Sequence, residues 1–301
     1  MSSTTLAEKS SSPVKPLRKR KKIAMPYLLL LPGMLWLITF FLIPILTLVK
    51  TSVNMDLANY DPLAEGGGTF WGNFWYALRT HEAPFVRSFI YALAATLIAL
   101  CIAYPLAYGI AFKSGRWKNV LLVLVVAPFF TSFILRTIAW KQILGQQGPV
   151  FRLLLDLHLV TYQSHITASA GAVIAGLSYN FLPFMTLPLY SSLERIDPRT
   201  LEASGDLYAN AFTTFRKVTL PLSLPGVVAG TLLTFIPAAG DYVNAEILGN
   251  PSTTMIGNVI NAQFLRTSNY TLAAALSFVF MVMIIAIVLF YISRAGTEEL
   301  V

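Results

Sequence analysis

Residues 192–226 read SLERIDPRTLEASGDLYANAFTTFRKVTLPLSLPG, a long polar stretch between uncharged segments. Asp197 is followed by proline, which predicts a helix start, because Asp caps a helix and Pro suits its first position. If that helix continues, Tyr208, Phe212 and Phe215 fall at i, i+4 and i+7 and form an apolar stripe. The stretch is too charged to cross a bilayer but has a face to bury. It therefore either packs on its own membrane domain or docks a cytoplasmic partner.

The composition is that of an integral membrane protein. Of the 301 residues, 55% are hydrophobic and only 12% are charged, whereas soluble domains are nearer a quarter charged. The net charge of +8 does not indicate nucleic-acid binding, since six basic residues gather at positions 15–22 beside an apolar segment. That arrangement is typical of a tail that meets anionic membrane lipid. The single cysteine, Cys101, excludes an intramolecular disulfide.

Six uncharged or weakly charged segments predict an all-α, polytopic membrane protein with six transmembrane helices. The predicted spans are about 23–49, 88–112, 119–135, 166–193, 220–240 and 272–293. The first is too long for a signal-peptide core, so we expect it to be retained. The predicted organisation is a basic tail (1–22), a permease domain (23–294) that contains the loop 194–219, and a short tail (295–301).

The distribution of basic residues predicts the orientation. Six spans place both chain ends on one side of the membrane, and that side carries fifteen of the 22 Lys and Arg. Because basic residues favour the cytoplasmic side, we expect both termini and the loop 194–219 to be cytoplasmic. The N-terminal tail supplies seven of the fifteen, and the basic turn 113–118 indicates the same orientation independently.

The sequence carries no motif for catalysis of its own. It lacks the phosphate-binding pattern G-x-x-x-x-G-K-[ST], as well as H-E-x-x-H and G-x-S-x-G. The three histidines have no partner at metal-ligand spacing. We therefore predict that the chain is not an enzyme, and that energy for any transport comes from a partner chain or an ion gradient.

The stretch 192–226 resembles the EAA loop found in the membrane subunits of bacterial ABC importers. The family pattern runs Glu-Ala-Ala, a short gap, Gly, nine residues, an aliphatic residue, one residue, then Leu-Pro. The matching positions here are Glu202, Ala203, Ser204, Asp206, Val218, Leu220 and Pro221. Ser204 replaces the second Ala, and Tyr208 stands where the family has Gly. Because Gly permits a positive φ that Tyr adopts poorly, the turn is the point where this chain departs from the family.

The resemblance extends over nearly the whole chain and favours the polyamine branch of these importers. The segments that carry it are Asn73-Phe74, 104–108 (YPLAY), 127–129 (APF) with Arg136-Thr137, 237–242 (PAAGDY), 246–249 (EILG) and 255–258 (MIGN). Residues 237–258 give the strongest match, to spermidine/putrescine permeases. The resemblance implies a six-helix permease of the bacterial cytoplasmic membrane with the type I importer fold.

The resemblance also implies partners. They are a second permease chain, two copies of a cytoplasmic ATPase that bind ATP and Mg, and an external solute-binding protein; no cofactor is implied for this chain. The family's EAA loop forms a coupling helix that sits in a groove of the ATPase. In this chain Glu202, Ala203, Ser204, Asp206, Tyr208, Leu220 and Pro221 are the implied coupling residues.

Candidates for the substrate path follow from the chemistry of a polycation. Cations are attracted to carboxylates and aromatic faces, and ionisable residues beside a span are functional candidates. We therefore select Asp241, Tyr242, Glu246 and Trp140, and Arg136 as a group that pairs with an acidic residue at an outer gate. The alternatives are solvated outer-loop carboxylates and interfacial aromatic anchors.

Two other functions remain open at the level of the sequence. An ABC permease for another small organic solute shares the same motifs. An independent secondary transporter is the third reading, although we detect no inverted repeat of the kind common in such proteins.

Overall fold

The computed structural model describes residues 24–53, 72–159, 161 and 166–295, and this part of the chain is entirely helical apart from turns and connecting segments. Contacts divide the chain into two compact units, Met1–Thr47 and Leu48–Val301. The described part of the first unit contains α1 (Ala24–Leu37), a π-helical turn (Ile38–Leu42) and the beginning of α2 (Ile43–Ser52). The most apolar part of Leu29–Ser52 has no residue buried within the chain.

The second unit contains the remaining helices. They are α3 (Gly72–Thr80), α4 (Glu82–Tyr108), α5 (Lys118–Val126), α6 (Phe133–Leu144), α7 (Pro149–Asp156), α8 (Ala170–Glu194), α9 (Pro198–Asp206), α10 (Ala211–Thr214), α11 (Leu220–Leu222), α12 (Leu224–Ala239), α13 (Val243–Leu248), α14 (Ile256–Leu265) and α15 (Tyr270–Ala295). Short 3₁₀ or π-helical turns join several of them: η3 (Gly109–Lys113), η4 (Gly115–Trp117), η5 (Ala127–Phe130), η6 (Phe215–Thr219) and η7 (Pro251–Thr253).

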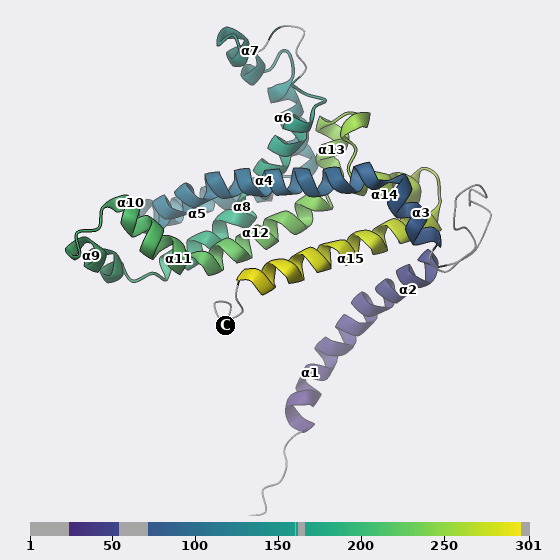
Figure 1. The fold of residues 1–301 in the computed structure, drawn as a ribbon, viewed down its shortest axis with the longest axis horizontal. Coiled ribbons are helices and arrows are strands. Elements are labelled where there is room, and N and C mark those ends of the chain that lie inside the picture. Colours follow the sequence, from purple (N-terminus) through teal and green to yellow (C-terminus); the bar gives the residue numbers. More distant parts are fainter. Residues whose placement is uncertain (1–23, 54–71, 160, 162–165, 296–301) are drawn as a thin grey trace, which may run out of the picture. The chain divides into compact units, whose positions relative to one another are not determined.

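Helices α4, α8 and α12 form the centre of this unit and lie side by side (Figure 1). Their contact depends on small residues, as is usual where helices pack in membranes. On α4 the fully buried alanines recur every three or four residues, at Ala92, Ala95, Ala99, Ala103 and Ala107. This spacing places them along one face of a helix.

Two glycines of α12 allow its backbone to approach α8. A β-carbon at Gly226 would lie 2.8 Å from the carbonyl oxygen of Pro188, and one at Gly230 would lie 3.0 Å from that of Met185. Both distances are shorter than ordinary van der Waals contact, so a larger residue would push the two helices apart.

Sharp bends interrupt two of the predicted spans. The chain turns by 96° between Gly115–Phe130 and Phe133–Asp156, and by 65° between Ala211–Leu222 and Leu224–Ala239. At the first bend Thr131 is extended. Helices α5 and η5 together extend only about 20 Å, less than the hydrocarbon core of a bilayer. The predicted segment 119–135 is therefore not one straight helix.

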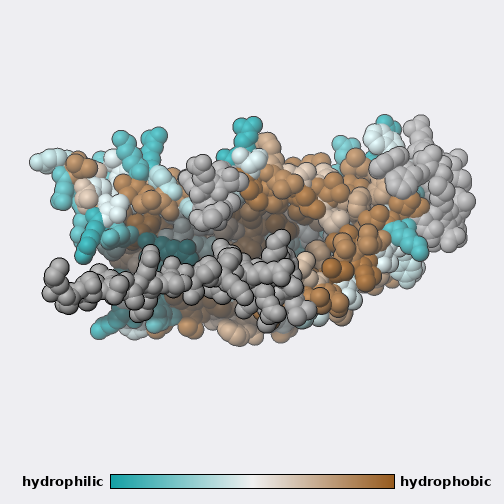
Figure 2. Space-filling model, turned by 90° about the horizontal axis from the view of Figure 1, so that it is seen from below, coloured by the Kyte–Doolittle hydropathy of each residue, from teal (hydrophilic) through white to brown (hydrophobic). Residues whose placement is uncertain are grey.

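Four helices are long and apolar enough to cross a membrane, and six spans result if each bent pair counts as one. Much of the surface shown in Figure 2 is hydrophobic, whereas hydrophilic residues gather at the end that carries α9 and α10. An all-helical fold with an exposed apolar surface is that of a multi-pass membrane protein.

Candidate functional site

The polar stretch that follows α8 begins with the helix that the sequence predicts. The Asp197 side chain accepts a hydrogen bond from the backbone N–H of Arg199 at 3.0 Å, and Pro198 is the first residue of α9. Just before it, Lys118 Nζ lies 2.6 Å from Glu194 Oε1, so an ion pair joins the end of α8 to the start of α5. The predicted helix start at Asp197 is confirmed.

Helix α9 ends in a turn that reverses the chain direction. The N–H of Ala209 donates to the carbonyl of Ser204 at 3.1 Å, and the N–H of Tyr208 donates to that of Gly205 at 2.9 Å. This pair of bonds is a Schellman motif, whose central residue is left-handed and is usually glycine. Tyr208 adopts that conformation, with φ 61°. The turn keeps the geometry that glycine would favour although the residue is tyrosine.

The helix that starts at Pro198 does not continue to Phe215, so the stripe that depended on its continuation does not form. The left-handed residue ends one helix, and the Asn210 side chain starts the next by accepting a hydrogen bond from Thr213 N–H at 2.8 Å. Tyr208 is 99% exposed and Phe212 is 70% exposed. Phe215 instead packs edge-on against Tyr104 of α4, with ring centroids 5.4 Å apart. The three aromatics therefore have different surroundings.

The remaining coupling candidates divide between exposed and buried positions. Glu202, Ala203 and Asp206 are exposed on α9, whereas Ser204 is buried and its Oγ lies 2.8 Å from Thr214 Oγ1 of α10. This bond holds the two short helices together. Leu220 and Pro221 form the start of α11, just before the bend into α12.

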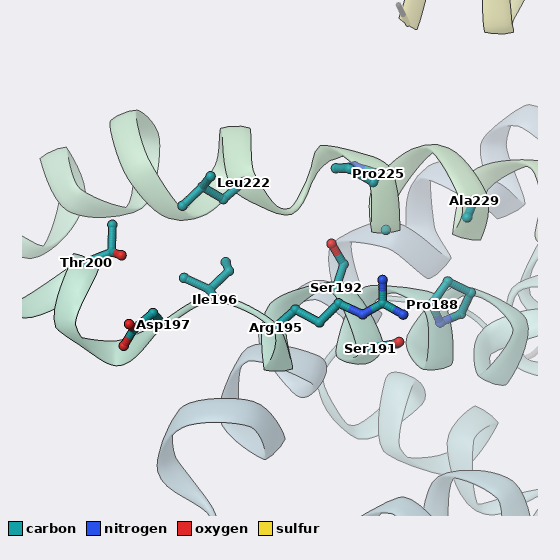
Figure 3. Close-up of a pocket in the computed structure, with 11 residues that line it drawn as sticks. Pro188, Ser191, Ser192, Arg195, Ile196, Asp197, Thr200, Leu222, Pro225 and Ala229 are labelled. Atoms are coloured by element: carbon teal, nitrogen blue, oxygen red, sulfur yellow. The ribbon is translucent and has the colours of Figure 1, made fainter. Parts of the chain in front are cut away.

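A groove of about 580 Å³ lies between the end of α8, the segment leading to α9, and α11 and α12 (Figure 3). Arg195 extends along it towards Pro188, and Asp197 and Leu222 line its other end. The groove lies between the start of α9 and the beginning of α12, while Leu201 of α9 packs against the buried cluster that contains Leu193 and Ile196.

A second set of functional candidates surrounds Asp241, just beyond the end of α12. Asp241 Oδ1 accepts hydrogen bonds from the backbone N–H and the side-chain amide of Asn244, at 2.7 and 3.2 Å. The Asn244 carbonyl Oδ1 in turn accepts from Asn180 Nδ2 at 3.0 Å, and Asn180 Nδ2 also lies 3.2 Å from Thr137 Oγ1. We call Thr137, Asn180, Asp241 and Asn244 the polar cluster; all four are buried. It joins α6, α8 and the start of α13.

Burial determines the charge behaviour of Asp241. The residue is 9% exposed, and loss of hydration raises the pKa of its carboxyl to about 6, while the hydrogen bonds from Asn244 oppose that rise. Asp241 lies outside the candidate spans. The side chain is therefore a buried carboxyl that titrates closer to neutral pH than an exposed aspartate and is hydrogen-bonded to Asn244.

Glu246, on the same short helix α13, has a different environment. Its Oε1 lies 2.7 Å from Arg266 Nη2, and its Oε2 accepts a hydrogen bond from Asn258 Nδ2 at 3.3 Å. Both partners of the ion pair are more than half exposed. Glu246 and Asp241 thus do not share a hydrogen-bond partner, and the charge of Glu246 is already balanced.

The other path candidates lie on or near these elements. Tyr242 is 45% exposed, and the Trp140 ring packs edge-on against Tyr179 of α8 at 5.3 Å. Arg136 lies over the rings of Phe129 and Phe133, at 5.4 and 5.6 Å. Within the described residues Arg136 Nε and Nη1 are buried without a hydrogen-bond partner. The expected acidic partner of Arg136 is therefore not found in this part of the chain.

Three members of the polar cluster, Thr137, Asn180 and Asn244, were not selected from the sequence as path residues. Asn180 could have been recognised from the sequence, because an amide within the apolar segment 166–193 needs hydrogen-bond partners when it is buried. The other two become recognisable only once the fold brings together residues 43 and 64 positions from Asn180.

Comparisons with known proteins agree with this architecture. Residues 99–295 match the family model described as "Binding-protein-dependent transport system inner membrane component". The spermidine/putrescine transport system permease protein PotB of Haemophilus influenzae is 37% identical over 264 residues, which are 87% of this chain and 90% of that protein. PotB of Escherichia coli is 39% identical over 186 residues, covering 62% and 68% of the two chains.

A further relative and a solved structure extend the comparison. The inner membrane ABC transporter permease protein YdcU of Escherichia coli is 33% identical over 227 residues, covering 71% of this chain and 72% of that protein. A chain of a bacterial alginate ABC transporter, solved with an alginate-bound periplasmic protein, matches with a TM-score of 0.66 over 93% of this chain and 96% of that one. At 17% identity that match supports the fold alone. On the family match and the PotB identity, this chain belongs to the binding-protein-dependent inner membrane components, the permease subunits of ABC importers.

Proposed function

We propose that this permease imports polyamines of the spermidine and putrescine class. The observation that carries the proposal is the identity to PotB proteins, which extends over most of both chains. The buried carboxylate of Asp241 supports it, because a polycation needs anionic groups along its path. YdcU, whose name states no solute, is the observation that keeps another small organic solute as the second candidate.

Membership of the family establishes that the chain is a transport subunit that depends on partner proteins. As a permease subunit of an inner-membrane importer it is not an enzyme, binds no cofactor, and works with an ATPase and a solute-binding protein. The reading as an independent secondary transporter is thereby set aside. Beyond this, we propose that the complete importer contains a second permease chain and two ATPase copies.

The coupling loop is proposed to face the cytoplasm and to dock the ATPase through α9. The excess of basic residues on that side supports this orientation, with both termini cytoplasmic. Glu202 and Asp206 offer exposed carboxylates, and the exposed side chains of Tyr208 and Phe212 offer apolar contact. Ser204, Leu220 and Pro221 are proposed to hold the loop in shape rather than to touch the partner.

The proposed substrate path includes Asp241, with Tyr242 and Trp140 as aromatic faces. Glu246 belongs to the outer entrance, where Arg266 already neutralises it. Arg136 lies next to Asp241's cluster on α6, and its charge and ring contacts suit a closed gate that repels cations.

The experiment compares Asp241→Asn with Glu246→Gln in the reconstituted importer, measuring spermidine uptake. We expect Asp241→Asn to reduce uptake by about ten-fold or more, because the carboxylate that attracts the polycation is lost. We expect Glu246→Gln to change uptake by less than about three-fold, because Glu246 is exposed and already paired with Arg266. Spermidine uptake that is equal to that of the unaltered protein in both variants contradicts this path. Absence of spermidine uptake by the unaltered importer contradicts the polyamine assignment.

A further inference from the structure

We propose that Asn244 is a positioning residue, which holds the Asp241 carboxylate so that its Oδ2 atom receives an ammonium group of the passing substrate. The inference rests on the proposed function, since it specifies how the path carboxylate is presented. Asn244 acts through Asp241.

The two oxygens of Asp241 have different surroundings. Oδ1 accepts both hydrogen bonds from Asn244, one from the backbone and one from the side chain. Oδ2 accepts none from the described residues, and it is not among their fully buried unpartnered atoms. It therefore keeps contact with solvent. Two donors on one oxygen fix the rotation of the carboxylate and leave the other oxygen available to a cation.

Asn244 is itself held from two further helices. Its Oδ1 accepts from Asn180 of α8 at 3.0 Å and lies 3.4 Å from Thr137 Oγ1 of α6. These contacts occupy the carbonyl end of the Asn244 side chain, so its amide end is directed to Asp241. A β-carbon at Gly176 of α8 would lie 2.8 Å from Asn244 Oδ1. Glycine at that position gives Asn244 the room it occupies.

The polar cluster contains a buried group that lowers the stability of the folded state. Asn180 is 1% exposed, and its Oδ1 is buried without a hydrogen-bond partner in the described part of the chain. An unsatisfied buried acceptor destabilises the folded state, and apolar residues of similar shape avoid that cost. A role in presenting Asp241 accounts for amides at these positions.

Charged groups on the neighbouring elements do not account for the state of Asp241. Arg136 and Lys141 are on α6 and Glu246 is on α13, and none of them is among the groups that shift the pKa of Asp241. Burial raises that pKa, and the hydrogen bonds from Asn244 lower it. A substitution at Asn244 should therefore change the pKa of Asp241.

The test uses the importer reconstituted with its ATPase, second permease chain and binding protein, with labelled spermidine as the probe. Asn244→Ala removes the side-chain donor, Asn244→Asp removes it with the same shape but adds a second carboxyl, and Asn244→Ser restores a hydroxyl donor. Ser178→Ala is the matched control, because Ser178 is buried two residues from Asn180 but bonds only to backbone carbonyls of Ala95 and Ile174. The readouts are spermidine imported per ATP hydrolysed and its dependence on pH.

We expect Asn244→Ala and Asn244→Asp to lower import per ATP by about ten-fold, the effect of a lost hydrogen bond to a charged group. Asn244→Ser recovers most of it, and Ser178→Ala changes nothing. Import by the unaltered protein falls as pH drops through about 6, where Asp241 takes up a proton. In Asn244→Ala the midpoint moves to higher pH, because the side-chain donor that lowers the pKa is gone while the backbone donor remains. In Asn244→Asp it moves further, because the added carboxyl also disfavours the charged form of Asp241.

Two results overturn the inference. One is an unchanged import per ATP and an unchanged midpoint in both Asn244→Ala and Asn244→Asp. The other is a parallel fall in import and ATP hydrolysis with no shift of the midpoint, which indicates a purely structural role. If Asn244→Ala does not reach the membrane, Asn244→Asp takes its place, and import per ATP decides rather than the midpoint, because the added carboxyl shifts the midpoint through its charge. Spermidine uptake that is lost in Asp241→Asn but normal in both Asn244 variants refutes this inference and leaves the proposed function intact.

Discussion

Tyr208 holds a backbone conformation that its side chain does not favour. A left-handed residue other than glycine costs about 1–2 kcal/mol, yet the Tyr208 ring is 99% exposed and makes no contact with the described residues that would offset this cost. The two Schellman hydrogen bonds keep the turn in place. We infer that both the turn and the exposed ring belong to the surface offered to the ATPase.

Variants of Tyr208 separate the turn from the ring. Tyr208→Val should reduce co-purification of the ATPase by about ten-fold, because a β-branched residue is strongly disfavoured at positive φ. Tyr208→Phe should leave it unchanged, and any loss in Tyr208→Gly measures the ring contact alone. Equal ATPase recovery with Val and Phe would show that the turn does not matter.

The sequence identifies some site residues and not others. Asp241 and Glu246 are recognisable because a carboxylate beside an apolar segment is unusual. The sequence does not show that their surroundings differ, because Arg266 lies beside Glu246 and Asn244 beside Asp241 only in the folded chain. Thr137 is an ordinary residue in the sequence and acquires a role only from tertiary contacts.

The coupling loop contacts α4 of the helical core. Tyr104 connects them: its ring packs against Phe215 of η6, and its hydroxyl lies 2.7 Å from Ser223 Oγ at the bend before α12. Ser223 is fully buried. One side chain of α4 thus contacts the C-terminal part of the loop, at Phe215, and the bend that follows it, at Ser223. We propose that movement of α9 reaches the helices through these two contacts.

Tyr104 variants test that connection. Tyr104→Phe keeps the ring on Phe215 and removes one hydrogen bond, so we expect a change of less than about three-fold in uptake. Tyr104→Ala removes the ring and leaves a cavity beside Phe215. We expect ATP hydrolysis to continue while spermidine import per ATP falls by about ten-fold or more. Normal import per ATP in Tyr104→Ala would refute the connection.

The sequence predicts the long helices but not the bends that interrupt the shorter ones. The long apolar segments 88–112, 166–193 and 272–293 fall within or across the long helices α4, α8 and α15, because a continuous apolar run has few other structures available. The bends at Thr131 and Ser223 were not predicted. Prolines near both positions permit a kink, but they also occur inside α8 without a break of that size. Packing decides which proline bends its helix.

Within the second unit, α9 and α10 lie far from α3 and α14. One end carries α9 and α10, and the opposite end carries α3 and α14 (Figure 1). We propose that the first end is cytoplasmic, which is an orientation that the charge distribution predicts. The polar cluster lies between them, at the level of α6 and α13.

Thiol labelling tests the orientation. Cys101 is the single cysteine, so Cys101→Ser gives a background without thiols. Leu207→Cys, at an exposed position of the coupling loop, should react with a membrane-impermeant reagent only after the cells are opened. Glu82→Cys, exposed at the start of α4, should react in intact cells. The reverse pattern would contradict the proposed orientation.

We propose that this chain is the membrane path for polyamines in an ATP-driven importer. The most direct measurement is ATP-dependent uptake of labelled spermidine and putrescine into vesicles that contain the ATPase, the second permease chain and the binding protein, with and without this subunit. The account predicts uptake of both solutes only when this subunit and ATP are present. ATP-dependent uptake of another small organic solute, with neither polyamine imported, would contradict it.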